Sequence, residues 1–213
     1  MVFVSAPVAL IIFNREDTLT EVVNQLKKHD IAHLYIIADG ARDDAELERV
    51  EKVRSIAEQV PARKVTKVYA ESNLGLKRNV SQGVTRAFED SEQVIVLEDD
   101  CVPCDSFFES AEKIKTVLAR DPGLAGFCGS SFLPTFFNQR IWKSNRSSIW
   151  GWVANKATWV EFMNSGFLEM SSNQIIQHKK SLNALPLIGR WEVLRMMKVL
   201  DSLDTWDVPF EIF

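Results

Sequence analysis

Short apolar runs alternate with longer amphipathic stretches through the first 130 residues of the chain. The apolar runs are rich in β-branched side chains and too short for helices, so they predict buried strands. The stretches between them repeat apolar residues at helical spacing, as at Leu47, Val50 and Val53, and predict amphipathic helices. Thr18 and Glu21 have the spacing of a capping box and predict a helix start. The predicted strands are 8–13, 34–38, 64–70, 94–97 and 124–128, and the predicted helices are 18–29, 44–59, 76–89 and 107–119.

This order of strands and helices is typical of an α/β domain, with a mostly parallel sheet and helices on both of its faces. Ligands of such sheets bind beyond the carboxyl ends of the strands, so the residues that follow each strand are the candidates for a site. These residues are mostly polar. They are Asn14 and Arg15 after the first strand, Asp39 after the second, Asn73 and Gly75 after the third, and Glu98, Asp99 and Asp100 after the fourth.

The three consecutive acids after residue 97 repel one another unless water or a cation lies among them. Carboxylate oxygens are ligands for hard divalent cations such as Mg²⁺ and Mn²⁺, which take their remaining ligands from phosphates and water. The alternative is a solvated acidic turn that caps the next helix at Asp105. A phosphatase motif with a covalent aspartate also fits the spacing of Glu98, Asp100 and Val102, but its nucleophile position holds Glu, which argues against it.

Composition excludes several classes of protein. The chain has 213 residues with 46% hydrophobic and 25% charged, values that fit one globular domain. Its net charge of −4 and the lack of a basic patch argue against a nucleic-acid partner. Cys101, Cys104 and Cys128 are odd in number, which favours reduced thiols over disulfides, zinc or redox pairs. No run reaches the ~18 apolar residues of a membrane span, and the amino terminus lacks the basic start of a signal peptide, so we expect a cytoplasmic protein.

Several motifs follow in order along the chain. They are "IIFNR" (11–15), "IIADG" (36–40), "SNLGLKRN" (72–79), "VLEDD" (96–100), "SSIWGWVANKATW" (147–159) and "TWD" (205–207). Together they resemble a GT-A glycosyltransferase of the family 2 type, a group that is also similar to N-acetylglucosaminyltransferase I. The resemblance implies a Rossmann-like half at 1–129 that binds a nucleoside-diphosphate sugar, UDP-sugar being favoured. It implies that 130–213 forms the acceptor or lid half of the same domain and that this half is shortened at its carboxyl terminus. The pattern of the sequence predicts that the chain is mostly helical from 156 onward.

The resemblance also implies roles for individual residues. Asp100 would bind Mn²⁺ or Mg²⁺, which would bridge the two phosphates of the donor. Asp99, and with it Glu98, would accept hydrogen bonds from ribose or donor-sugar hydroxyls. Asp39 would accept a hydrogen bond from a ring N–H of the base, and Arg15, next to Asn14, would contact nucleotide or phosphate. Gly75 would let the backbone approach the nucleotide, Asn73 and Asn79 would hold the loop, and Trp150, Gly151 and Trp152 would face the acceptor or the donor sugar.

Asp207 would be the base that takes the proton from an acceptor hydroxyl, and attack opposite the phosphate would invert the anomeric carbon. The acceptor would be a glycan, a lipid-linked molecule or a protein. Simpler interpretations remain open: Arg15 can pair with Glu16 or Asp17, Gly75 can be a helix-entry glycine, and one of Trp150 and Trp152 can be a core residue. The alternative functions are a catalytically silent nucleotide-binding or scaffold protein and a nucleotidyltransferase, although "NRED" (14–17) is not the glycine-rich loop that the latter requires.

Overall fold

The computed structural model describes residues 1–121, 123–130, 141, 143, 149–171, 173 and 174. Its described strands form one seven-stranded sheet. Strands β2, β3, β4 and β5 run parallel, the short β1 pairs in parallel with the start of β3, and β7 pairs antiparallel with both β5 and β6. The strands are β1 (Phe3–Val4), β2 (Val8–Ile12), β3 (Asp30–Ala38), β4 (Ala62–Tyr69), β5 (Gln93–Glu98), β6 (Gly126–Cys128) and β7 (Trp152–Asn155).

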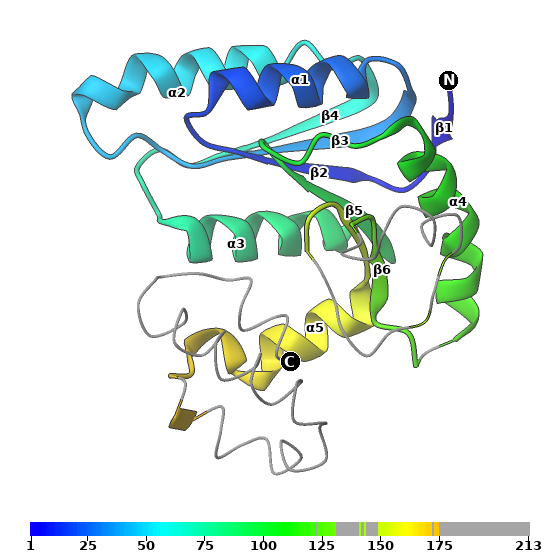
Figure 1. Cartoon of the computed structure of the whole chain (residues 1–213). Helices are drawn as coiled ribbons and strands as arrows, with labels where there is room; N and C mark the ends of the chain where they lie inside the picture. Colours follow the sequence, from blue (N-terminus) through cyan, green and yellow to red (C-terminus); the bar gives the residue numbers. More distant parts are fainter. Residues whose placement is uncertain (122, 131–140, 142, 144–148, 172, 175–213) are drawn as a thin grey trace.

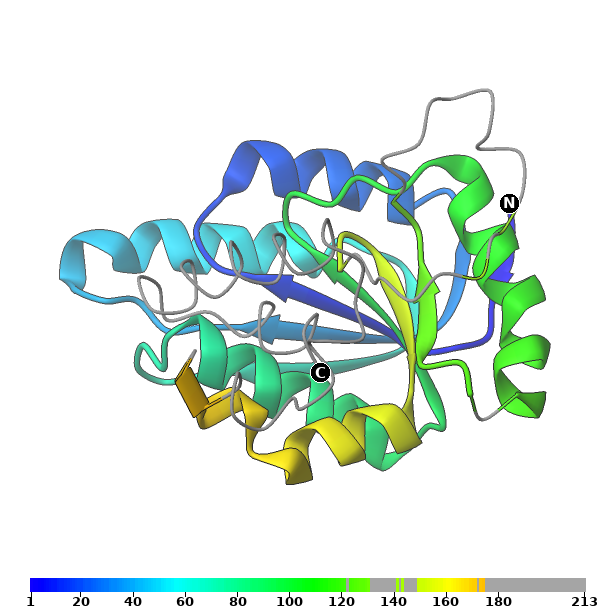
Figure 2. The ribbon, with the colours of Figure 1, turned by 60° about the horizontal axis from the view of Figure 1, so that its bottom comes forward.

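Helices cover both faces of this sheet (Figures 1 and 2). Helices α1 (Glu16–Leu26), α2 (Asp44–Ala57) and α4 (Asp105–Arg120) pack on one face in a single core with β2 and β3. Helices α3 (Leu76–Glu89) and α5 (Lys156–Ser165) cover the other face, and the short 3₁₀ helix η2 (Phe167–Glu169) follows α5. The predicted α/β fold with helices on both faces is therefore confirmed.

Most predicted elements exist with shifted ends, and two local predictions are wrong. Helix α1 begins at Glu16 rather than Thr18, and the Thr18 hydroxyl is a buried oxygen with no partner in the described residues. Thr18 therefore does not cap the helix. Leu47, predicted on the buried face of α2, is 48% exposed, because α2 turns only a narrow stripe to the core at Val50, Val53 and Ala57.

Part of the second half of the chain completes the same sheet. Strand β7 pairs with β5 over Val96↔Trp152 to Gln93↔Asn155, and β6 extends the sheet beyond it. The division into halves at residue 129 remains a prediction. In the described part of the chain, every helix is too short or too polar to cross a bilayer.

Helix α3 approaches β3 closely at a glycine. A Cβ atom at Gly83 would lie 2.3 Å from the Cγ2 of Ile37, whose side chain is fully buried. We expect Gly83→Ala to lower the free energy of unfolding by about 1–3 kcal/mol, because overpacking of a filled core displaces side chains and backbone. Urea unfolding measures this change, with the neighbouring Gln82→Ala as the control. A Gly83→Ala variant at least as stable as wild type would show that the contact is not tight.

Candidate functional site

The carboxyl ends of β2, β3, β4 and β5 meet at one edge of the sheet, on the left in Figure 1. The parallel pairing of these strands brings the loops that follow them together. The polar residues predicted from the sequence lie at the last position of β5, in these loops or in the first turn of the helix that follows. They are Asn14, Arg15, Asp39, Asn73, Gly75, Asn79, Glu98, Asp99 and Asp100.

Arg15 is the cation that lies among the acids. Its Nη2 is 2.7 Å from Asp99 Oδ1, and its Nη1 donates to Asp100 Oδ2 at 2.5 Å. The predicted alternative, pairing with Glu16 or Asp17, is not what the structure shows. The backbone N–H of Phe13 also donates to Asp99 Oδ2 at 3.2 Å, so this carboxylate ties the end of β2 to the end of β5.

The two acids differ in how far water reaches them. The Asp99 side chain is 2% exposed, whereas the Asp100 side chain is 42% exposed. Burial raises the pKa of Asp99 above its ordinary value, although Arg15 and the Phe13 N–H oppose that rise. The pKa of Arg15 is raised, since attraction to Asp99 and Asp100 outweighs the partial burial of the guanidinium. Asp100 is thus the acid of this pair that is open to a ligand.

Asp39 organises the loop between β4 and α3. Its Oδ1 accepts hydrogen bonds from Gly40 N at 2.8 Å and Leu74 N at 2.7 Å. Its Oδ2 accepts from Gly75 N at 3.0 Å and from Asn73 Nδ2 at 3.2 Å. Gly75 has φ +81° and is the N-cap of α3, so the interpretation of it as a helix-entry glycine is confirmed.

A second cluster supports the start of α1 from α2. Glu46 Oε1 accepts from Asn14 Nδ2 at 2.6 Å and from Arg42 at 2.5 Å, and these contacts place Asn14 and Arg42 beside one another. Hydrogen bonds from Arg42 and Asn14 lower the pKa of Glu46 to about 2. Next to this cluster is a hollow of about 470 Å³, lined by Asn14, Arg15, Glu16, Asp17, Thr18 and Arg49.

With this geometry in place, the comparison with known families is decisive. The sequence model of "Glycosyl transferase family 2" matches residues 8–182, most of the chain and all of the strands that form the edge. The chain belongs to glycosyl transferase family 2. A comparison with curated proteins gave no significant match.

The tryptophan segment of this family 2 glycosyltransferase reaches the same edge. Because β7 runs antiparallel to β5 with Trp152 opposite Val96, the residues just before Trp152 lie beyond the carboxyl end of β5. Gly151 has φ +69° and its carbonyl accepts from Gly129 N at 2.7 Å. Trp150 is 65% exposed and Trp152 is 3% exposed, which confirms that one of them belongs to the core.

The predicted catalytic base of the glycosyltransferase, Asp207, lies outside the described residues. Asn79 is 6% exposed, and its backbone N–H donates to the carbonyl of Gly75 at 3.0 Å in the first turn of α3. Glu98 ends β5, where it lies opposite Ile11 of β2. Sequence reasoning missed Phe13 and Glu46, because a backbone donor and a surface-type charge carry no motif.

The donor set at the edge fits a divalent cation only in part. No cluster of three or more metal-ligating side chains occurs in the described residues, so this part of the chain does not by itself form a cage for a metal ion. Asp100 offers one exposed carboxylate, a set suited to a cation that takes its other ligands from phosphates and water. Burial raises the pKa of the adjacent Cys101 to about 12, so this thiol is not a ready thiolate ligand.

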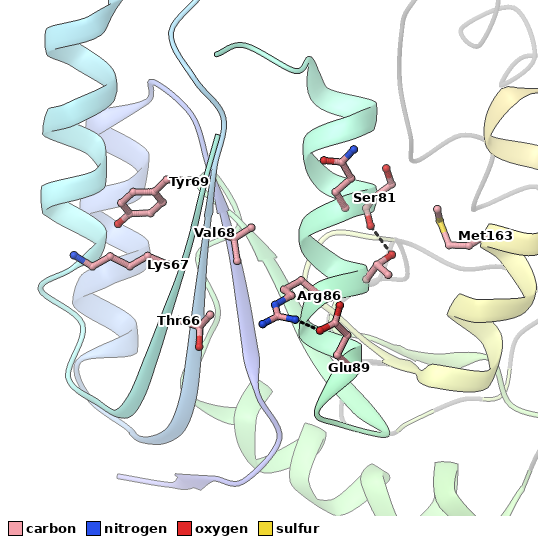
Figure 3. Close-up of a pocket in the computed structure, with 10 residues that line it drawn as sticks. Thr66, Lys67, Val68, Tyr69, Ser81, Arg86, Glu89 and Met163 are labelled. Atoms are coloured by element: carbon pink, nitrogen blue, oxygen red, sulfur yellow. Dashed lines mark hydrogen bonds and ion pairs between the residues drawn. The ribbon is translucent and has the colours of Figure 1, made fainter. Parts of the chain in front are cut away.

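A larger hollow, of about 630 Å³, lies away from this edge (Figure 3). It runs between the outer strand β4 and helix α3 and reaches Met163 of α5. Thr66 and Val68 face α3, whereas Lys67 and Tyr69 project from the opposite side of the strand (Figure 3). None of the predicted site residues lines this hollow, and its size alone does not make it the site.

We expect Arg15→Gln to destabilise the fold, because Asp99 would lose its buried counter-ion. Loss of one partner of a fully buried pair costs about 3–5 kcal/mol, and exposed pairs are worth about 0–1 kcal/mol. The Arg15 side chain is 51% exposed, so we expect an intermediate loss of about 1–2 kcal/mol in urea unfolding. The control is Arg49→Gln. Arg49 lines the hollow of about 470 Å³ together with Arg15 but pairs with no acid in the described residues. Equal losses in the two variants would contradict a specific role for the pair.

The Glu46 cluster predicts a pH-dependent stability. The folded pKa of Glu46 is depressed, so its contribution is present above its ordinary pKa of 4.5 and is lost as pH falls toward about 2. We therefore expect Glu46→Gln to be less stable than wild type at pH 7, and the difference to shrink between pH 4.5 and pH 2. Urea unfolding at several pH values measures it, with Glu48→Gln on the same helix as the control. A difference that is constant with pH would contradict this prediction.

Proposed function

We propose that this chain transfers a sugar from a nucleoside-diphosphate sugar to an acceptor hydroxyl, with inversion at the anomeric carbon and with the help of Mn²⁺ or Mg²⁺. The observation that carries the proposal is the edge of the sheet in a family 2 glycosyltransferase. There an exposed carboxylate, Asp100, lies 2.5 Å from the Arg15 guanidinium, at the edge of the sheet where the loop that ends at Gly75 also lies.

The donor would lie across the carboxyl ends of the parallel strands, where ligands of open α/β sheets bind. Asp100 would hold the divalent cation, which when bound would offset the charge that develops on the leaving diphosphate. Arg15 is placed to donate paired hydrogen bonds to a phosphate, a geometry that suits guanidinium groups. The Asp99 side chain is 2% exposed and already meets Arg15 and Phe13 N, so it can contact ribose or sugar hydroxyls only if its surroundings move.

The acceptor would approach from the side of Trp150, whose exposed ring is suited to stacking on a sugar. Asp207 would take the proton from the attacking hydroxyl. The resemblance to N-acetylglucosaminyltransferase I favours a hexosyl or N-acetylhexosaminyl donor with UDP. The acceptor would be a glycan, a lipid-linked molecule or a protein.

The experiment is a panel of nucleotide sugars, tested by thermal shift with Mn²⁺ and with EDTA and then assayed for product. We expect one UDP-sugar to raise the melting temperature only with Mn²⁺. Asp100→Asn would remove this shift, because a neutral amide is a poorer ligand for a hard cation. Asp207→Asn would keep the shift and lower transfer at least about 100-fold, the low end of what a general base contributes.

The products separate the alternatives. Release of nucleoside diphosphate supports a transferase, release of pyrophosphate indicates nucleotidyl transfer, and binding without turnover in the wild type indicates a silent nucleotide-binding protein. Near-normal transfer by Asp207→Asn would remove that residue from the role of base. Equal binding with Mn²⁺ and with EDTA would remove the cation from the proposal.

A further inference from the structure

Arg54 of α2 joins the ends of two neighbouring strands. Its Nη2 donates to the backbone carbonyl oxygens of Asp39 at 3.1 Å and Ala70 at 2.9 Å. These are the first carbonyls beyond β3 and β4. The Arg54 side chain is 14% exposed, lies over the Tyr69 ring with its Cζ 4.7 Å from the centroid, and donates from Nη1 to Glu51 at 2.7 Å.

This arrangement fixes the backbone from which the Asp39 carboxylate projects. The backbone hydrogen bonds between β3 and β4 end where Ala70 N donates to Ala38 O at 2.9 Å. Among the described residues, no further backbone–backbone hydrogen bond joins the two segments directly beyond this point. A guanidinium has a planar, rigid set of donors, so it holds two carbonyls in one geometry where a flexible lysine would not. The orientation of Asp39 therefore depends on Arg54.

The Asp39 carboxylate has no acceptor position left over. An ionised carboxylate offers about four lone-pair sites, and the N–H groups of Gly40, Leu74, Gly75 and Asn73 use four. The two loops also touch through their backbones, since a Cβ at Gly40 would lie 2.4 Å from the carbonyl carbon of Ser72. A nucleotide base that donated a hydrogen bond to the Asp39 carboxylate would have to displace one of these four bonds. It would also have to reach a residue that is only 5% exposed.

We propose that Arg54 and Asp39 form a positioning pair that builds the 72–75 loop for the donor nucleotide, and that Asp39 does not select the base. The inference rests on the proposed function, because it presumes that a nucleotide lies against this loop. It revises the role that the family resemblance implies for Asp39, and it adds Arg54, which no motif indicates.

The matched ligands are UDP and CDP, which have the same size but differ at ring position 3. Uracil carries a donor N–H there and cytosine an acceptor nitrogen, so a carboxylate that reads the base favours UDP and an amide does not. We would measure the affinity for both in Mn²⁺ for wild type, Asp39→Asn, Arg54→Met and Arg54→Lys. Hydrogen exchange at the Leu74 and Gly75 amides, with Val96 and Leu97 as internal references, reports the loop directly.

If the pair positions the loop, Asp39→Asn and Arg54→Met exchange the Leu74 and Gly75 amides about tenfold faster or more, as expected when a hydrogen bond is lost. Both variants also bind UDP and CDP more weakly by a common factor, so the affinity ratio stays within about twofold of wild type. Arg54→Lys falls between wild type and Arg54→Met. The control is Arg63→Met, which removes an arginine that pairs with Asp30 and lies over Phe3 at the opposite end of β4. It leaves both readouts unchanged.

The opposite pattern would overturn the inference. If Asp39→Asn loses affinity for UDP but not for CDP while the Leu74 and Gly75 amides stay protected, base recognition belongs to Asp39. Unchanged exchange and affinity in Arg54→Met would remove Arg54 from any role. Arg54→Met retains the Asp39 side chain itself, so it decides the matter even if Asp39→Asn does not fold. If the wild type binds no nucleoside diphosphate, the proposed function fails, and the exchange measurements still decide whether the pair holds the loop.

Discussion

Two carboxylates are buried at the carboxyl edge of the sheet, and each has to be compensated where it lies. An unpaired charge in such a position would cost several kcal/mol, as order of magnitude. Asp39 is compensated by N–H donors of its own loops, and Asp99 by the Arg15 guanidinium and the Phe13 N–H. These contacts fix the two loops that flank the ends of β3 and β5. The shape of the edge is therefore a consequence of satisfying these two acids.

The two solutions differ in what they leave open to a ligand. The donors to Asp39 are backbone amides and one asparagine, so on that side of the edge neutral groups of the protein itself hold the carboxylate. Arg15 is half-exposed and shared between Asp99 and Asp100, so on the other side a charged group can exchange partners with solvent or ligand. A diphosphate would offer Arg15 new acceptors at the moment a cation takes up Asp100. The edge thus combines a carboxylate held by the protein's own N–H groups, at Asp39, with a partly exposed ion pair, at Arg15 and Asp100.

The sequence was sufficient to predict β2 to β6, the parallel arrangement of β2 to β5 and the gathering of polar residues at one edge, since each follows from hydrophobic patterning and topology. It was also sufficient to predict that one of Trp150 and Trp152 is buried. It did not predict β1 or β7. The sequence did not predict which charges pair. Arg15 has acids beside it in sequence, yet it binds Asp99 and Asp100, the latter 85 residues away, because β2 and β5 are neighbours. The capping box at Thr18 failed because the helix begins earlier at Glu16. In the sequence, Arg54 looks like an ordinary charged residue on the surface of a helix. Only the structure shows that it donates to the carbonyls at the ends of β3 and β4.

The antiparallel strand β7 gives the edge its second side. A parallel strand at this position would enter the sheet at the amino edge, and its preceding residues would lie far from Asp100. Because β7 runs the other way, the segment that precedes it, Trp150 and Gly151, arrives beside the carboxyl end of β5. Gly151 adopts φ +69° there, a backbone conformation that residues with a side chain rarely adopt. It lies close to Leu97 and Phe107. The register of β7 and the conformation of Gly151 thereby place Trp150 at the acidic edge.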